Sequence, residues 1–243
     1  MRVEIDDLTV DITTPRWSET VVRSVTFSIP SGHVTAVLGE SGCGKSMVAA
    51  AIAGRLPEVA SMSGRVSVVD DVRELGFRHP VEIGYVPQEG LSAFVRGVPV
   101  ETQLRELASQ YDGANVHKAC AAARYPRFEM SSLYPEHHSG GQIQRAALAA
   151  ALLATPDVLV VDDPTSSLDT YTARTVWYAL ADYASTGAAV VAVTHDVDHV
   201  LHTGTVERVV IMREGRVAIQ GPMKCVKSSD DPYIQGFFRS FGS

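Results

Sequence analysis

The feature that most constrains the fold of this 243-residue chain is a glycine-rich run set between an apolar strand and a small-residue helix. Val34–Leu38 is apolar apart from one threonine, and Met47–Ala53 reads as a helix that Gly54 ends. Strand, glycine-rich loop and helix make the start of a βαβ unit, so an α/β fold is predicted. The intervening run matches G-x-x-x-x-G-K-[ST] and consists of Gly39, Glu40, Ser41, Gly42, Cys43, Gly44, Lys45 and Ser46.

The residue types in this loop, residues 39–46, suit the binding of phosphate. Its glycines let backbone N–H groups converge on phosphate oxygens, and the helix that follows adds its positive end. Lys45 supplies a point charge to the β- and γ-phosphates of ATP, and Ser46 offers a hydroxyl to Mg²⁺. Cys43 occupies a free position of the motif, where a small filler is favoured over a redox-sensitive thiol.

Two adjacent carboxylates follow a second apolar strand. Val158–Val161 leads directly into Asp162 and Asp163, and ligand sites of α/β sheets lie at the carboxyl ends of strands. Asp162 is suited to the Mg²⁺ shell, and Asp163 to orienting or deprotonating an attacking water. A turn built on Asp-Asp-Pro is the alternative interpretation.

Periodicity extends the α/β pattern over the rest of the chain. Val25, Phe27 and Ile29 alternate with polar residues, as in a half-buried strand, and Ala188–Val193 is a further apolar strand. Continuous apolar strands alternating with helices predict a mostly parallel sheet covered on both faces. Further elements are expected at about 98–154 and Tyr171–Tyr183 (helical), and at Val209–Met212 and Val217–Ile219 (a closing hairpin).

Composition and charge exclude several classes of protein. With 45% hydrophobic residues the chain is not disordered, and its formal net charge of −7 argues against a broad nucleic-acid surface. The longest apolar run, Ala146–Ala154, is far short of the ~20 residues of a membrane helix, and the acidic N-terminus resembles neither signal peptide nor anchor. Three scattered cysteines fit a reducing cytosol. We therefore expect any membrane attachment to come through a partner.

Another glycine-rich segment opens the longest Ala/Leu helix. Its residues are Ser139, Gly140, Gly141 and Gln142, in which serine and glutamine have capping-box spacing. A glycine-rich helix start is also an anion site, so this signature segment by itself fits a ligand site and a bare cap equally well.

Three more motifs complete an ordered set. Gln88 ends Tyr-Val-Pro-Gln, and His195 lies in Thr-His-Asp at the end of the last apolar strand. An SxLD segment follows the paired acids and consists of Ser166, Ser167, Leu168 and Asp169. Phosphate loop, glutamine, SGGQ, paired acids, SxLD and strand-end histidine occur in the order of ABC ATPases. The chain resembles that family over essentially its whole length.

The resemblance implies a fold and a mechanism. The fold is a P-loop NTPase core with an N-terminal antiparallel β subdomain and an α-helical subdomain inserted at about 91–154, all within one domain of residues 1–243. Two subunits sandwich two ATP molecules. Each site joins one subunit's phosphate loop, acids, Gln88 (also toward Mg²⁺) and γ-phosphate-contacting His195 to the other's signature segment.

The same resemblance implies the partners of this chain and its location in the cell. Integral membrane permease subunits, a second ATP-binding subunit and, indirectly, a periplasmic or extracellular solute-binding protein are expected, with this chain peripheral at the cytoplasmic membrane face. Short strings resemble the dipeptide, oligopeptide and nickel importer branch: Gly39–Gly42, Ser92–Phe94, Leu133–Pro135 and Asp231–Gln235. The end at Ser243, without a longer cysteine-containing tail, favours nickel- or metallophore-type members.

The sequence departs from the family pattern at three places. Asp163 stands where glutamate is usual, and His138 where the signature usually has leucine. Ile12 stands at the place of the adenine-stacking aromatic, with Trp17 the nearest candidate. His137 and His138 lack further ligands at metal-binding spacing.

The shorter Asp163 side chain retracts its carboxylate by about 1 Å, a displacement that can cost roughly a hundredfold in rate. We therefore expect slow hydrolysis at this chain's own site and an asymmetric heterodimer. The alternatives are an ABC-type ATPase that works without a membrane, and a subunit that binds ATP but hydrolyses it weakly.

Overall fold

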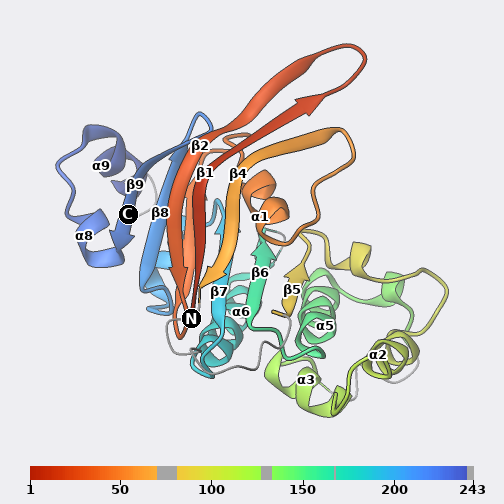
Figure 1. The fold of residues 1–243 in the computed structure, drawn as a ribbon. Helices are drawn as coiled ribbons and strands as arrows, with labels where there is room; N and C mark the ends of the chain where they lie inside the picture. Colours follow the sequence, from red (N-terminus) through yellow and green to blue (C-terminus); the bar gives the residue numbers. More distant parts are fainter. Residues whose placement is uncertain (70–80, 127–132, 167, 240–243) are drawn as a thin grey trace.

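The computed structural model describes residues 1–69, 81–126, 133–166 and 168–239. Within those residues, none of the helices combines the length and the apolar character needed to cross a membrane. Two sheets and two groups of helices make up the fold (Figure 1).

The main sheet has six strands, and all but the last run parallel to their neighbours. Its central strands are buried at every residue, which is why they read as continuous apolar runs. In spatial order the strands are β5 (Ile83–Val86), β6 (Val158–Asp162), β7 (Ala189–Thr194), β3 (Val34–Gly39), β8 (Arg208–Arg213) and β9 (Arg216–Pro222).

A smaller antiparallel sheet precedes it in the chain. Its order is β2 (Ser18–Pro30), β1 (Arg2–Thr13) and β4 (Ala60–Val69). Val25, Phe27 and Ile29 are buried as their alternation predicts, and they pack on α1 (Lys45–Ile52) and one face of the main sheet. The sequence pattern did not predict β4, because residues 61–65 are exposed and none of the residues of this strand is fully buried.

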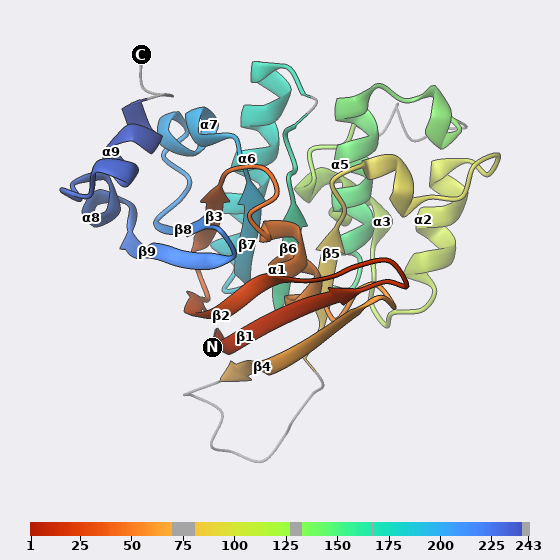
Figure 2. The ribbon, with the colours of Figure 1, turned by 90° about the horizontal axis from the view of Figure 1, so that it is seen from above.

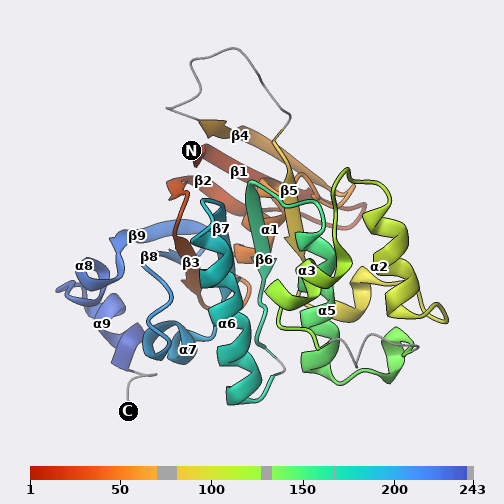
Figure 3. The same cartoon turned by 90° about the horizontal axis from the view of Figure 1, so that it is seen from below.

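Helices cover the opposite face of the main sheet, where α5 (Gly140–Leu152) and α6 (Thr170–Ala184) share a second apolar core with β3, β6 and β7 (Figure 3). Among the described residues, the other helices are α2 (Val100–Ala108), α3 (Val116–Ala122), α7 (Val197–His202), α8 (Met223–Lys227) and α9 (Pro232–Arg239), with short 3₁₀ turns η1 (Gly90–Ala93) and η2 (Pro135–His137).

The helical insertion lies between β5 and β6 in the chain and at one end of the main sheet, while α8 and α9 lie at the other end (Figure 2). Its described part comprises η1, α2, α3, η2 and α5, so the expected helical stretch is there divided into separate short elements. The predicted α/β class, with a mostly parallel sheet, an N-terminal antiparallel sheet and a helical insertion, is confirmed.

Candidate functional site

A cavity of about 870 Å³ opens where the parallel strands of the main sheet end. The phosphate loop forms its floor, and the ends of β6 and β7 and the segment after β5 form one side. Besides loop residues, the lining comprises Val21, Met47, Gln88, Asp162, Asp163, Val193, Thr194, His195, Pro232, Tyr233, Gly236 and Phe237.

Left-handed backbone at two glycines shapes the phosphate loop. Gly42 has φ +81° and Gly44 has φ +98°, and a Cβ on Gly44 would lie 2.6 Å from the carbonyl oxygen of Val21. Helix α1 begins directly after Gly44, two residues earlier than its apolar pattern predicts. The positive end of the helix therefore meets the loop, as anion binding requires.

Lys45 and Cys43 have different roles in this loop. The Lys45 ammonium donates to the carbonyl oxygens of Gly39 (2.9 Å) and Glu40 (2.8 Å), which holds its charge over the loop. Burial raises the pKa of the Cys43 thiol despite the nearby Lys45 charge, so the thiol stays protonated. A protonated, buried thiol fits the small-filler interpretation.

Ser46 and Asp162 form a compact oxygen-rich corner. The Ser46 hydroxyl donates to Asp162 Oδ1 (3.0 Å), and the Tyr85 hydroxyl lies 3.4 Å from Oδ2. Burial raises the pKa of Asp162, with the Asp163 charge adding to the rise, and burial followed by Asp162 raises the pKa of Tyr85 to about 12. Hydroxyl and carboxylate oxygens beside a phosphate loop are the donor set that Mg²⁺ prefers, so these residues fit that ion.

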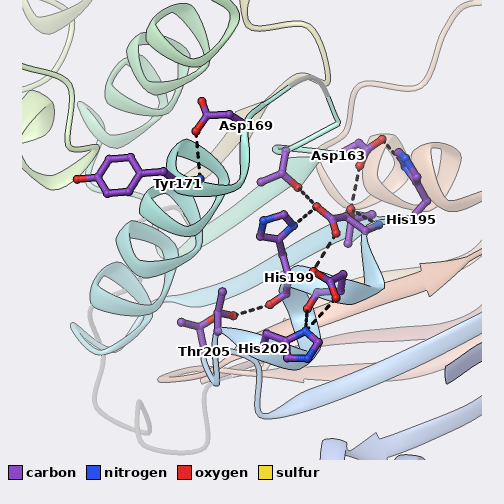
Figure 4. A network of polar contacts seen from close by, with 12 residues as sticks. Asp163, Asp169, Tyr171, His195, His199, His202 and Thr205 are labelled. Carbon is purple, nitrogen blue, oxygen red and sulfur yellow. Dashed lines mark hydrogen bonds and ion pairs between the residues drawn. The ribbon is translucent and has the colours of Figure 1, made fainter. Parts of the chain in front are cut away.

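Asp163 contacts both of the other side chains predicted to be catalytic, and Figure 4 shows it beside His195. Its Oδ2 is 2.8 Å from His195 Nδ1 and 3.4 Å from Gln88 Nε2, and its Oδ1 accepts from the Thr194 hydroxyl at 2.9 Å. Its backbone is left-handed, with φ +44°, and its N–H donates to the carbonyl of Val193 at 2.7 Å. The fold thus brings Gln88, Asp163 and His195 together from three strand ends.

The signature segment lies elsewhere. The predicted capping box is confirmed: Ser139 Oγ accepts from the N–H of Gln142 (3.3 Å), and Gln142 Oε1 accepts from the N–H of Ser139 (2.7 Å). A Cβ on Gly141 would lie 2.6 Å from Thr172 Cγ2, so a side chain there would require Thr172 to shift. In the described part of the chain, none of residues 139–142 lines the cavity.

The SxLD segment leads into α6 beside the signature segment. Asp169 caps that helix by accepting from the N–H groups of Tyr171 and Thr172, both at 3.0 Å (Figure 4). Leu168 packs against the apolar core, and Ser166 is exposed. Ser167 lies outside the described residues.

The departures from the family pattern have a structural context. His138 Nε2 is 2.6 Å from the Tyr125 hydroxyl and Nδ1 is 2.9 Å from the Tyr134 carbonyl, so both ring nitrogens are engaged within the protein. Over the described ranges, no three His, Cys, Asp or Glu side chains group as a metal site.

Sequence reasoning missed Thr194 and the contribution of α9. Among the described lining residues, the aromatic side chains are Tyr233 and Phe237, and neither Ile12 nor Trp17 is present. The Arg213 guanidinium lies 4.5 Å from the ring centroid of Tyr233, which anchors α9 beside the loop. In the sequence, Asp231–Gln235 served only as a resemblance, and no local pattern indicated that α9 lies at the cavity.

Comparisons with known proteins identify the family of this chain. Residues 22–166 match the family model described as ABC transporter. The chain is 33% identical over 235 residues to the oligopeptide transport ATP-binding protein OppD of Mycobacterium tuberculosis, covering 88% of this chain but only 37% of that protein. It is 30% identical over 263 residues to the dipeptide transport ATP-binding protein DppD of Bacillus subtilis, covering 98% of this chain and 76% of that protein.

Among solved structures, the fold is similar to a dimeric post-hydrolysis state of the ATP-binding cassette MJ0796 bound to ADP and Pi. The TM-score is 0.73 at 23% identity, with 91% of this chain and 98% of that chain covered. At 23% identity, this structural similarity supports the fold and nothing beyond it.

Proposed function

Because this chain belongs to the ABC transporter family, we propose that it binds and hydrolyses ATP to energise a membrane importer. It acts as one ABC ATPase domain over residues 1–243, with 91–154 as the helical subdomain. The observation that carries the proposal is that residues of the phosphate loop, Gln88, Asp162, Asp163 and His195 line one and the same cavity.

Each group in the cavity has a chemical task in ATP hydrolysis. Backbone N–H groups of the phosphate loop and the Lys45 ammonium bind the phosphates of ATP. Asp163 accepts a proton from, or orients, the attacking water, and Gln88 and His195 flank that carboxylate at 3.4 and 2.8 Å. Ser46, Asp162 and Gln88 would hold Mg²⁺, and the bound ion would neutralise charge that develops on the phosphates.

The functional unit contains two ATP-binding subunits. The signature segment does not line this chain's own cavity in the described structure, although its glycine-rich helix start suits an anion. We propose that it completes the site of a partner subunit. Since Asp163 has a shorter reach than glutamate, the partner is a different ATP-binding subunit whose own site hydrolyses faster.

The names of relatives support the peptide part of the cargo that we propose. The two curated relatives described above are named for oligopeptide and dipeptide transport. We propose an importer of peptides, nickel or metal chelates. Integral permease subunits are the other components of this transporter, and a solute-binding protein acts with it indirectly. This chain then works at the cytoplasmic face of the membrane as a peripheral subunit.

The test is purification of the tagged full chain from membranes of its native cell, with ATP turnover measured on the complex. We expect integral permease subunits and a second ATP-binding subunit in stoichiometric amounts, and turnover that is lost with Lys45→Ala. Turnover by a chain that purifies without membrane proteins would support the membrane-free alternative. Absence of single-turnover hydrolysis at this chain's own site would support the weakly hydrolysing one.

A further inference from the structure

Thr194, the last residue of β7, is fully buried and makes two hydrogen bonds through one hydroxyl. The hydroxyl accepts from the backbone N–H of Asp196 at 3.0 Å and lies 2.9 Å from Oδ1 of Asp163. No motif in the sequence assigned a task to this residue.

The direction of these two bonds is fixed by simple chemistry. A backbone N–H can only donate, so the lone pair that faces Asp196 is occupied as an acceptor. The hydroxyl has one proton, and a carboxylate is an acceptor, so that proton points to Asp163. Burial at 0% exposure leaves no room for water to substitute for Thr194.

The backbone that supports Thr194 is itself tied down. Asp196 Oδ2 accepts from the Thr165 hydroxyl at 3.0 Å and lies 2.6 Å from His199 Nδ1, while its Oδ1 accepts from the N–H of His199 at 3.2 Å (Figure 4). Asp196 therefore joins the segment after β6 to the segment after β7. Its N–H cannot turn away from Thr194 without breaking this network.

The two oxygens of Asp163 are consequently unequal. Thr194 holds Oδ1 from the buried side, whereas Oδ2 faces His195 and Gln88 at the cavity wall. Loss of the Thr194 donor would let the carboxylate rotate about its side-chain bonds and would leave a buried acceptor unsatisfied. Displacements of about 1 Å in such a group cost catalytic rate.

We propose that Thr194 is the positioning residue that orients the Asp163 carboxylate for the attacking water. The inference rests on the proposed ATPase function and deepens it, because it assigns the orientation of a short catalytic aspartate to a buried hydroxyl on the neighbouring strand.

The experiment compares Thr194→Val, which keeps the shape but removes the hydroxyl, with Thr194→Ser, which keeps the hydroxyl. Both are measured in the complete transporter complex, where single-turnover hydrolysis resolved between the two sites gives kcat and the KM of ATP for this chain's own site. We expect Thr194→Val to lower kcat about ten- to hundredfold, since hydrogen bonds to charged groups are the stronger class. The KM should change less than about twofold, and Thr194→Ser should retain most of the rate.

The matched control is Thr35→Val on β3. Thr35 is also fully buried in a central strand, but its hydroxyl has no hydrogen-bond partner among the described residues. This control should leave kcat unchanged. If Thr194→Val fails to fold, Thr194→Ala takes its place in the same comparison, with thermal melting confirming the fold.

A double-mutant cycle separates positioning from structural support. In an Asp163→Ala background, Thr194→Val should cause no further loss of kcat, because the group that it positions is gone. Equal additional loss in both backgrounds, or an unchanged kcat in Thr194→Val alone, overturns the inference. If the wild-type complex itself shows no ATP turnover, the proposed function fails instead.

Discussion

Asp163 Oδ2 and His195 Nδ1 lie 2.8 Å apart, although the two residues end different strands and their imidazole and carboxylate differ greatly in exposure. The His195 side chain is 58% exposed, whereas that of Asp163 is 11% exposed. The carboxylate is therefore held within the wall of the cavity, and the imidazole is open to solvent.

We expect Asp163→Asn to lower ATP turnover about a hundredfold or more. The amide keeps the size of the side chain but cannot accept a proton from water. Single-turnover hydrolysis, resolved between the two sites of the complex, measures the effect. Unchanged hydrolysis at this chain's own site would remove Asp163 from the catalytic machinery.

Asp163→Glu should raise turnover at the same site, roughly ten- to hundredfold, because the extra methylene extends the carboxylate farther into the cavity. Asp182→Glu on α6 is the matched control, since its side chain is 72% exposed and pairs with Arg124. A neutral or harmful effect would mean that aspartate is already fully effective. Equal wild-type rates at both sites of the complex would contradict the asymmetric heterodimer.

Lys45→Ala should weaken Mg-ATP binding at least about a hundredfold, because charge-assisted hydrogen bonds contribute roughly 1.5–3 kcal/mol each. Titration with ATP on the full chain measures the affinity. Lys118→Ala, at an exposed position of α3, should bind normally. The phosphate-loop assignment fails if the Lys45 variant, melting like wild type, binds ATP as tightly as wild type does.

Gly140→Asp should abolish most turnover of the complex while this chain still binds ATP. The new carboxylate would face the γ-phosphate of the partner's nucleotide, and like charges repel. Gln110→Asp, which adds the same charge at an exposed position after α2, serves as control. Loss of this chain's own ATP binding, with the fold intact, would place the signature segment in its own site instead.

Asp162→Asn should stabilise the nucleotide-free fold near neutral pH by a few degrees in Tm while lowering Mg²⁺-dependent turnover. Burial raises the pKa of Asp162, so the folded state holds this proton more tightly than the unfolded chain does. Wild-type stability therefore falls as pH rises from the ordinary aspartate pKa through the raised one.

The asparagine variant lacks that loss, so its advantage in Tm should grow over this pH interval and vanish in more acidic solution. Thermal melting across pH, with and without Mg-ATP, is the measurement. Asp182→Asn is the exposed control. An equal Tm for wild type and Asp162→Asn at every pH would show that the buried carboxylate has no stability cost.

The sequence by itself determined the elements whose signal is local. A glycine-rich motif between strand and helix specified the phosphate loop, because glycine adopts the left-handed backbone at 42 and 44 far more readily than residues with a side chain. The continuous apolar runs of β3, β6 and β7 specified buried parallel strands, because both faces of such strands are covered. The signature helix start followed from the spacing of Ser139 and Gln142.

The local patterns did not show which of these features meet; that followed from the family resemblance and, for the contacts themselves, from the tertiary structure. Gln88 lies 75 residues from Asp163, and Thr194 lies 31 residues from it, yet all three converge because β5, β6 and β7 are neighbours in the sheet. Strand order is not encoded in periodicity, which reports burial but not the identity of the partner strand. For the same reason, the sequence did not indicate the role of Thr194. A threonine at the end of a strand has no distinctive local pattern, and only the packing of β6 beside β7 brings its hydroxyl to the Asp163 carboxylate.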